Sequence, residues 1–289
     1  MEFTPGTNKN IAVVTDSTAD IPLDLVSKHQ ISVVPNIIIL GDRNLEDGKG
    51  ITRQEFYEQL HSMNPLPTTA TAASGVYEEL YAELFAHGAQ QVISTHASSK
   101  LSGIYNAARL AANEFDGRVK VIDSEQLTLG LGFQVLAAAE AIDQGTSLGH
   151  VEDIITDIRK RIRVVAMLDT LEYVRRSGRV SWAQARIGAL LRIKPFLEVS
   201  DGDVLSLGET RTFKRGVIRL ADLLTRLGPL EKLAVLHTNA EDEALTFAER
   251  YAPSNIPSPL IINVTTVIGT HVGPHGLGFA AVVQRPYPA

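Results

Sequence analysis

The residues best able to do chemistry are a group of hydroxyl side chains that follows an apolar run at Val92 and Ile93. The group comprises Ser94, Thr95, Ser98, Ser99 and Ser102. A helical pattern with small residues begins directly afterwards, at Gly103. At such a strand–loop–helix junction, hydroxyl groups and the N–H groups of the first helical turn can bind an anion, which the helix dipole also favours. The sequence therefore predicts an anion-binding loop, with the alternative that Ser102 only caps its helix.

Short β-branched runs alternate with amphipathic segments through the first half of the chain, which predicts a mostly parallel sheet with flanking helices. The expected strands cover residues 11–15, 31–40, 91–95 and 119–123. Because open parallel sheets bind ligands beyond the carboxyl ends of their strands, the loops there are candidate sites. These loops contain Asp16, Asp20 and Asp123, each of which could instead be an ordinary turn or cap residue. Residues 67–74 form a further hydroxyl-dense loop.

The second half of the chain has a different pattern, which predicts an α/β domain with a mixed sheet. Residues 164–168 and 233–238 are typical of buried strands. Residues 196–207 predict a β-hairpin, because Asp201 and Gly202 suit a two-residue turn between its strands.

The chain has 289 residues, enough for two domains of ordinary size. We expect an N-terminal α/β domain over residues 1–162 and a C-terminal α/β domain over residues 163–289. The boundary follows a long helix that Ser147 opens. Thr52 and Glu55 have the spacing of a capping box, which predicts a helix that starts after Thr52.

Composition excludes several classes of protein. The net charge is -6 and basic residues form no dense block, which argues against nucleic-acid binding. The apolar stretches fall short of the roughly 20 residues that a membrane-spanning helix needs, so stable membrane insertion is not expected. The absence of cysteine excludes disulfides and thiolate chemistry. Residues 1–10 are polar and are expected to be a disordered leader rather than a signal peptide, so the expected location is cytoplasmic.

Enzyme motifs for phosphate binding, dinucleotide binding and a nucleophile elbow are missing from the sequence. A serine hydrolase could still be assembled from Ser98 or Ser102 with His271 and Asp16, since triads are recognised by geometry. The serines have no strained elbow to activate them, which favours binding over catalysis. His271 and His275 have the spacing of a metal pair on a helix, but Gly273 and Pro274 between them exclude that helix, so no metal is expected.

Six ordered segments resemble the DegV family of bacterial fatty-acid-binding proteins. They are Val13–Pro22, Ser98–Gly103 with Tyr105, Val121–Ser124, Leu171–Tyr173 with Ser177–Val180, Leu191–Pro195 and Thr270–Pro274. The resemblance extends from about Ile11 to Val283 and implies two α/β domains with a long-chain fatty acid held between them.

The resemblance also implies roles for individual residues. On this basis Thr69 and Ser102 donate hydrogen bonds to the fatty acid carboxylate, Ser98 supports them, and His271 reaches over from the second domain. The fatty acid is the ligand, and no cofactor is implied. Affinity would come from the apolar tail and orientation from the hydroxyls.

A protein partner is implied as well, the catalytic subunit of a fatty acid kinase that converts the presented carboxylate to an acyl phosphate. The chain would then be a carrier rather than an enzyme. Arg179 and Arg211 are in positions that resemble basic residues facing this kinase. The alternative is that they pair with carboxylates of the chain itself, such as Glu172 or Glu209.

The sequence departs from the family pattern at three places. Residues 69–73 read Thr-Ala-Thr-Ala-Ala where the family has Thr-Ser-Gln-Pro-Ser, which leaves the geometry of this loop open. Ser177 and His275 stand where glycine is common, so a positive φ at either residue would be strained.

Overall fold

The computed structural model describes residues 10–184 and 193–285, which form two compact units. The first unit comprises Met1–Asn36 and Ala70–Lys160, and the second comprises Ile37–Thr69 and Arg161–Ala289. The chain passes from the first unit to the second between Lys160 and Arg161, close to the expected domain boundary after residue 162. Residues 37–69 differ from the expectation, since they belong to the second unit and not to a continuous N-terminal domain.

The first unit is built on a parallel sheet with the strand order β2-β1-β6-β7. Its strands are β1 (Ile11–Asp16), β2 (Ile31–Val34), β6 (Gln91–His96) and β7 (Val119–Asp123). Every residue of β1 is buried, as expected for a central strand covered on both faces. The predicted parallel sheet is confirmed, and its polar carboxyl ends all meet at one edge.

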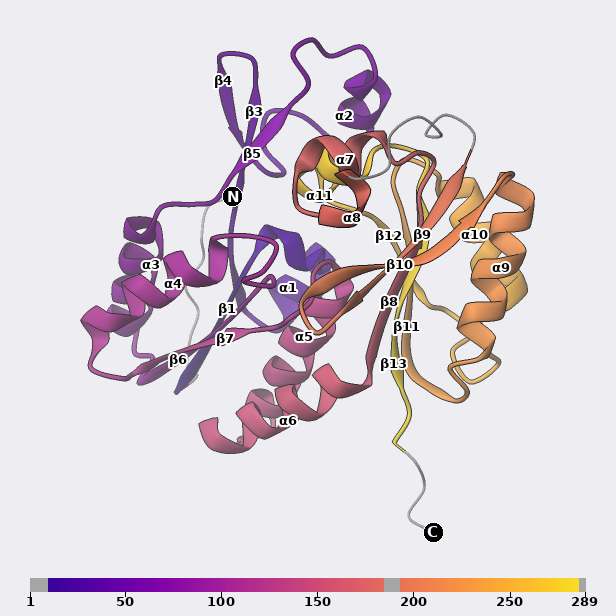
Figure 1. Cartoon of the computed structure of the whole chain (residues 1–289). Helices are drawn as coiled ribbons and strands as arrows, with labels where there is room; N and C mark the ends of the chain where they lie inside the picture. The colour runs from indigo at the N-terminus through magenta and orange to yellow at the C-terminus, as the bar shows by residue number, and fades with distance from the viewer. Residues whose placement is uncertain (1–9, 185–192, 286–289) are drawn as a thin grey trace. The chain divides into compact units, whose positions relative to one another are not determined.

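Helices cover both faces of this sheet. They are α1 (Leu23–Lys28), α3 (Ser74–Ala86), α4 (Ile104–Ala112), α5 (Leu129–Asp143) and α6 (Leu148–Arg161), with 3-10 turns η1 (Ser17–Ala19) and η2 (Asn113–Phe115). Helices α3 and α4 lie on one side, and α1 and α5 lie on the other (Figure 1). Thirteen of the 15 residues of α5 are buried, which explains why its sequence is apolar on all sides rather than amphipathic.

The prediction of one strand over residues 31–40 is wrong. Strand β2 ends at Val34, and β3 (Ile37–Leu40) belongs to a separate small sheet with the order β4-β3-β5. The break falls at Pro35, which has no N–H group to donate to a sheet ladder.

Residues 37–69 have an apolar cluster that explains their place in the second unit. The remaining elements of this segment are β4 (Arg43–Glu46), α2 (Arg53–Leu60) and β5 (Thr68–Ala70). Ile38, Phe56, Tyr57 and Leu60 are buried together with Val267 from far along the chain. The predicted capping box at the start of α2 is confirmed, with reciprocal contacts between its two members.

The second unit contains a six-stranded mixed sheet with the order β10-β9-β8-β13-β11-β12. Its strands are β8 (Ile162–Met167), β9 (Lys194–Ser200), β10 (Asp203–Thr210), β11 (Leu230–His237), β12 (Leu260–Asn263) and β13 (Leu277–Val283). Only the β11–β12 pair is parallel among these neighbours, so the predicted mixed sheet is confirmed. The predicted hairpin turn is also present, with φ of 49° at Asp201 and 81° at Gly202, both in the left-handed region that a two-residue turn needs.

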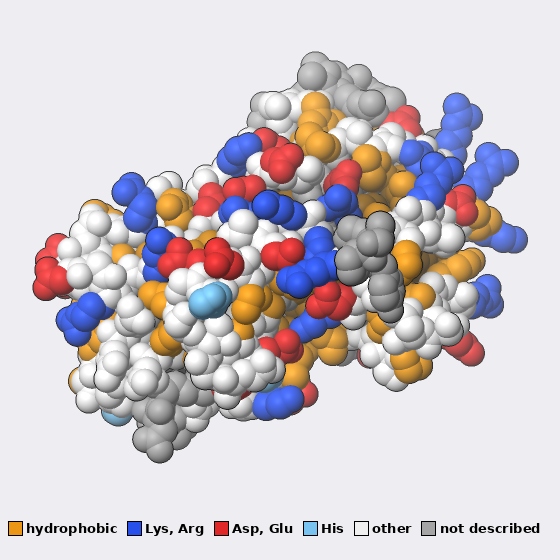
Figure 2. All heavy atoms as spheres, turned by 90° about the horizontal axis from the view of Figure 1, so that it is seen from below, with side chains coloured by type: hydrophobic (Ala, Val, Ile, Leu, Met, Phe, Trp, Pro, Cys, Tyr) orange, Lys and Arg blue, Asp and Glu red, His pale blue; other side chains and the backbone are white. Residues whose placement is uncertain are grey.

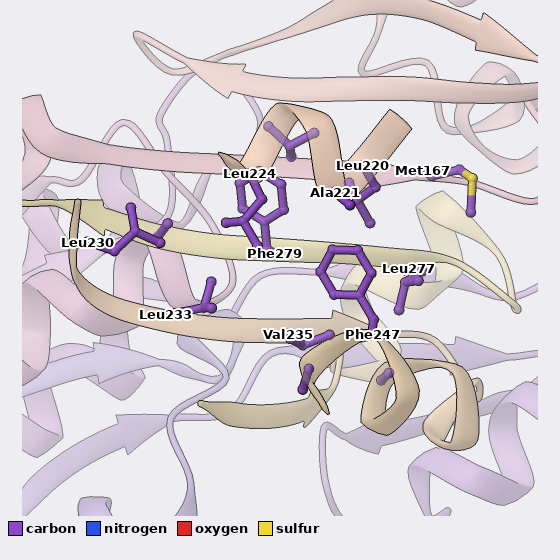
Figure 3. Close-up of a cluster of buried hydrophobic side chains, with 14 of the residues drawn as sticks. Met167, Leu220, Ala221, Leu224, Leu230, Leu233, Val235, Phe247, Leu277 and Phe279 are labelled. Carbon is purple, nitrogen blue, oxygen red and sulfur yellow. The ribbon is translucent and has the colours of Figure 1, made fainter. Parts of the chain in front are cut away.

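The main core of this unit lies between the mixed sheet and two of its helices (Figure 3). The helices of the unit, besides α2, are α7 (Glu172–Ser177), α8 (Ser181–Gln184), α9 (Phe213–Thr225), α10 (Glu241–Tyr251) and α11 (Thr266–Val272). Leu220 of α9 and Phe247 of α10 pack with Phe279 of β13 in this core. A second cluster, which includes Val174 and Leu197, brings α7 and α8 to the sheet.

The surface carries charges of both signs. On the face that Figure 2 shows, acidic, basic and apolar side chains are interspersed over much of the area. In the part of the chain that is described, no helix combines the length and apolar character that crossing a membrane requires.

Candidate functional site

The carboxyl edge of the parallel sheet is organised around Asp16, a fully buried carboxylate at the end of β1. It accepts hydrogen bonds from the backbone and hydroxyl of Thr18, the amide of Asn36, the ring of His96 and the backbone of Ala97. Burial raises the pKa of Asp16, but the hydrogen bonds from His96 and from Thr18 outweigh this effect, so the pKa is lowered. Asp16 is therefore an ionised group that ties three loops together.

His96 continues this network into the interior. Its Nδ1 lies 3.0 Å from the Asp16 carboxylate, and its Nε2 lies 2.7 Å from the Ser94 hydroxyl. The Ser94 hydroxyl lies 2.8 Å from the Tyr81 hydroxyl. Ser94, His96 and Asp16 thus have the contacts of a hydrolase triad, but all three are fully buried and the Ser94 hydroxyl is shared with Tyr81.

The alternative hydrolase would need the Asp16 carboxylate for His271, but in the first unit this carboxylate already contacts another histidine. The histidine in contact with Asp16 is His96, which sequence reasoning missed. A signal for it was available, because Ser94 and His96 are two residues apart in a strand and so share one face.

The hydroxyl loop after β6 is held by hydrogen bonds to its own backbone and to a neighbouring loop. The amide of Ser98 donates to the Gln126 carbonyl over 2.9 Å, and the amide of Ser99 donates to the Asp123 carboxylate. The amide of Ser102 donates to the Ser98 carbonyl over 3.1 Å. These three amides are occupied, so an anionic ligand at this loop would be met by side-chain hydroxyls and by the amides of the first turn of α4.

Ser98 and Ser102 lie at the two ends of one turn of this loop. Ser98 is fully buried and Ser102 is half-buried. The Ser102 hydroxyl accepts a long hydrogen bond of 3.4 Å from the Ile104 amide, so it has a weak capping role and keeps a proton to donate. Gly103 faces Thr71, whose hydroxyl oxygen would lie 3.9 Å from a Cβ at that glycine. Thr71 is thus a neighbour of the loop that the predicted site omitted.

A second hydroxyl group lies in the second unit. The Thr69 hydroxyl on β5 is 2.9 Å from Nε2 of His271, in the last turn of α11. Thr69 was expected in the N-terminal domain with Ser102, but it belongs to the unit that contains His271. The structure therefore pairs Thr69 with His271 in one unit, and Ser98 with Ser102 in the other.

Helix α11 is fixed in place by residues of the segment 37–69. The carboxylate of Asp47 accepts hydrogen bonds from the hydroxyls of Thr265 and Thr266 at the start of the helix. Tyr57 donates to the Val264 carbonyl over 2.8 Å and lies against Gly269, where a side chain would collide with its ring. These contacts set the position of the helix end that presents the imidazole to β5.

The imidazole of His271 is neutral at physiological pH. Burial, followed by the positive charge of Arg179, lowers the pKa of His271 to about 4. Arg179 itself is exposed, and its guanidinium donates to the Ser177 carbonyl over 2.6 Å. The expected alternative partner, Glu172, forms its ion pair with Arg176 instead, over 2.7 Å.

Arg211 is also exposed, in the short connection between β10 and α9. Within the described ranges, neither Arg179 nor Arg211 has a carboxylate within ion-pair distance. Both guanidinium groups are therefore accessible in the described structure.

The remaining expectations from the sequence concern backbone strain and metal ligands. His275 has a φ of 58°, so the expected strain is present there, whereas Ser177 ends α7 and Gly178 takes the positive φ of 70°. Helix α11 ends at Val272, so His271 and His275 do not share a helical face. Among residues 10–184 and 193–285, no group of three potential metal ligands is found. Leu191 and Arg192 of the fifth motif, and residues 1–9 of the expected leader, lie outside the described residues.

Fold and site define a two-unit α/β protein with hydroxyl groups in both units, and comparisons with known proteins give its family. The family model described as "Uncharacterised protein, DegV family" matches residues 10–284. The chain belongs to the DegV family.

Relatives and solved structures agree over the full length. Protein DegV of Bacillus subtilis is 37% identical over 278 residues, which cover 93% of this chain and 98% of that protein. A structure reported for fatty acid binding of a DegV family protein from Thermus thermophilus has a TM-score of 0.88 at 32% identity, covering 95% of this chain and 100% of that one. The structure of DegV, a fatty acid binding protein from Bacillus subtilis, has a TM-score of 0.84 at 34% identity. The match covers 96% of this chain and 100% of that one.

The environment of His271 predicts a specific titration. Its ring should stay neutral until the pH falls to about 4, as followed by NMR of the imidazole nitrogens. The unfolded chain takes up this proton near pH 6.5, so the stability contributed by neutral His271 is complete above that pH and is lost as the pH falls through about 4.

The substitution Arg179→Ala should raise the pKa of His271 without restoring its ordinary value, because the burial of the ring remains. Arg211→Ala is the control and should leave it unchanged. If the pKa of His271 in the Arg179→Ala variant equals that of the parent, the charge of Arg179 does not affect the imidazole.

Proposed function

We propose that this protein binds a long-chain fatty acid between its two units and presents the carboxylate to the catalytic subunit of a fatty acid kinase. Thr69, Ser98, Ser102 and His271 are proposed to hold the carboxylate. The observation that carries the proposal is the Thr69–His271 pair, a hydroxyl backed by a neutral imidazole, in a chain with fatty-acid-binding relatives.

Because His271 is neutral, its single N–H group can determine the direction in which the Thr69 hydroxyl donates. A neutral imidazole has one N–H donor, and when this proton is on Nε2 it points to the Thr69 oxygen 2.9 Å away. The hydroxyl proton of Thr69 is then available to a ligand. A carboxylate is the ligand that accepts such a proton best, since hydrogen bonds to a charged acceptor are the stronger ones.

Chain connectivity supports one carboxylate site that uses hydroxyls of both units. Thr69 contacts His271 in the second unit, and Thr71 lies beside Gly103 in the first. Only Ala70 separates the two threonines, so their Cα atoms are at most about 7 Å apart. We infer that the Thr69–His271 pair and the loop with Ser98 and Ser102 act on the same head group.

The expected binding energies give different roles to the apolar tail and the carboxylate of the ligand. A tail of about 14 methylenes contributes roughly 11 kcal/mol before the costs of binding, at about 0.8 kcal/mol per buried CH₂. Each hydrogen bond to the charged carboxylate contributes about 1.5 to 3 kcal/mol. The tail would therefore set affinity, and the hydroxyls would set the orientation of the carboxylate.

The same reasoning gives the protein the role of a carrier without a cofactor. The sequence has no phosphate-binding loop, which suits a division in which the kinase partner binds the nucleotide. Because that reaction needs a nucleotide, the proposal places both proteins in the cytoplasm. Arg179 and Arg211 are proposed to face the kinase, since both guanidinium groups are exposed and neither is held by a carboxylate in the described residues.

The first test is the ligand content of the purified protein. Mass spectrometry after denaturation and solvent extraction should recover a long-chain fatty acid at close to one equivalent. Delipidated protein should take up added fatty acid again, with burial of the tail as the driving force. Recovery of less than about a tenth of an equivalent, together with no uptake, would remove fatty acid binding as the function, since a tail of this length gives tight binding.

Removal of two hydroxyls tests the carboxylate site. The double variant Thr69→Ala, Ser102→Ala should weaken fatty acid binding by about 2 to 4 kcal/mol, the loss expected for two hydrogen bonds whose partners become unsatisfied. Acyl-phosphate formation with a fatty acid kinase should fall further, because the carboxylate is no longer oriented. Ser27→Ala with Ser206→Ala is the matched control, with one exposed hydroxyl removed from each unit. Parent-like binding and turnover in the first variant would place the carboxylate elsewhere.

The partner face is tested by removing two positive charges. Arg179→Ala with Arg211→Ala should retain its fatty acid but form acyl phosphate slowly, because exposed charges act mainly on association. The defect should shrink as the kinase concentration rises, and parent activity should fall with added salt. Arg43→Ala with Arg226→Ala changes the net charge equally at other exposed positions of the second unit and should behave like the parent. Loss of lipid from the first variant would assign the arginines a structural role, and full turnover would exclude them from the interface.

A further inference from the structure

We propose that His96 is a positioning residue for the carboxylate site, acting through Asp16 on the backbone of the hydroxyl loop. The inference rests on the proposed function, since it names the group that keeps Ser98 and Ser102 in place for a ligand. His96 itself is fully buried in the described structure and does not touch the ligand in this proposal.

Hydrogen-bond accounting fixes the proton arrangement of the buried network. With His96 neutral and its proton on Nδ1, Tyr81 donates to Ser94, Ser94 donates to Nε2, and Nδ1 donates to Asp16. Each polar atom in the series then has a partner. With His96 doubly protonated, Ser94 would accept from Nε2, and either the Ser94 proton or the Tyr81 proton would have no acceptor in contact among the described residues. The geometry favours the neutral ring with its proton directed at Asp16.

His96 acts on the hydroxyl loop through one oxygen of the Asp16 carboxylate. The same Asp16 oxygen that accepts from His96 also accepts from the Ala97 amide, over 3.2 Å. The other oxygen is held by Thr18 and Asn36. The His96 donor therefore fixes the carboxylate in the orientation that receives the Ala97 amide, which directly precedes Ser98.

Packing leaves His96 one available position. The edge of its ring meets Tyr77, with ring centroids 5.2 Å apart and planes at 86°. Tyr77 and Tyr81 are both fully buried, and burial raises the pKa of each, so both phenols are neutral beside the Asp16 charge. A ring enclosed in this way is a rigid donor, and rigidity is what a positioning group requires.

Two substitutions separate the two ends of the imidazole. Asparagine places an N–H donor near the position of Nδ1, so His96→Asn keeps the bond to Asp16 and loses the bond to Ser94. Glutamine can place its amide oxygen near the position of Nε2, so His96→Gln can still accept the hydrogen bond from Ser94 but loses the bond to Asp16. Each variant removes one hydrogen bond from the same buried ring site, which makes them matched in chemistry. Ser94→Ala is a further control that leaves the Asp16 contact intact.

Fatty acid affinity and amide hydrogen exchange at Ala97 are measured on the parent and on each variant. His96→Asn and Ser94→Ala should remain within about threefold of the parent in both, whereas His96→Gln should bind about tenfold more weakly and exchange about tenfold faster at Ala97. Equal behaviour of His96→Asn and His96→Gln overturns the proposal. Greater loss in His96→Asn does so as well, because it assigns the effect to Ser94.

NMR of the parent gives an independent result should the variants fail to fold. The imidazole of His96 should be neutral with its proton on Nδ1, and a proton on Nε2 alone overturns the proposal. Failure of the proposed function is recognised separately, because it appears as a parent protein that takes up no fatty acid. In that event the exchange of Ala97, which needs no ligand, still decides whether His96 holds the loop.

Discussion

The buried charge of Asp16 is the interaction on which the carboxyl edge of the first unit depends. An ionised carboxylate in the interior costs several kcal/mol unless hydrogen bonds replace its water. Here the hydrogen bonds that replace water come from three places. Thr18 donates from the turn after β1, and Asn36 donates from the connection that follows β2. His96 and Ala97 donate from the end of β6 and the residue after it. Three connections are thus held by one group, and the connection after β6 continues directly into the hydroxyl loop.

A similar arrangement holds the second unit. The carboxylate of Asp47 is buried against the hydroxyls of Thr265 and Thr266, where it also suits the positive end of α11. This contact joins the segment 37–69 to a helix more than 200 residues away in the sequence. Each unit therefore follows the same physical rule, in which a buried carboxylate anchors the surrounding chain.

Features that depend on local pattern could be predicted from the sequence, and features that depend on distant contacts could not. Apolar runs identified the strands of the parallel sheet, and Asp201-Gly202 identified the hairpin, because strand periodicity and turn chemistry act within a few residues. The single strand over residues 31–40 failed because Pro35 divides an otherwise uniform apolar run. The place of Thr69 depends on Ile38 and Phe56 being buried with Val267, which no local pattern reports. Asp16 was recognised as a possible turn residue, which is correct for its bond to Thr18, but its bond to His96 spans 80 residues.

The occupied backbone amides of the hydroxyl loop bear on how a carrier could release its ligand. Asp16 and Asp123 use the amides of Ala97 and Ser99, so these two donors of the loop are not available to an anion. A fatty acid carboxylate would be met by uncharged hydroxyls, one of them backed by the neutral His271 ring, and each such bond contributes about 1.5 to 3 kcal/mol. A head group held in this way is oriented but weakly retained, so a partner enzyme could remove or modify it at small cost. Ion pairs with lysine or arginine at the same place would hold the carboxylate more strongly and would favour storage of the ligand over its transfer.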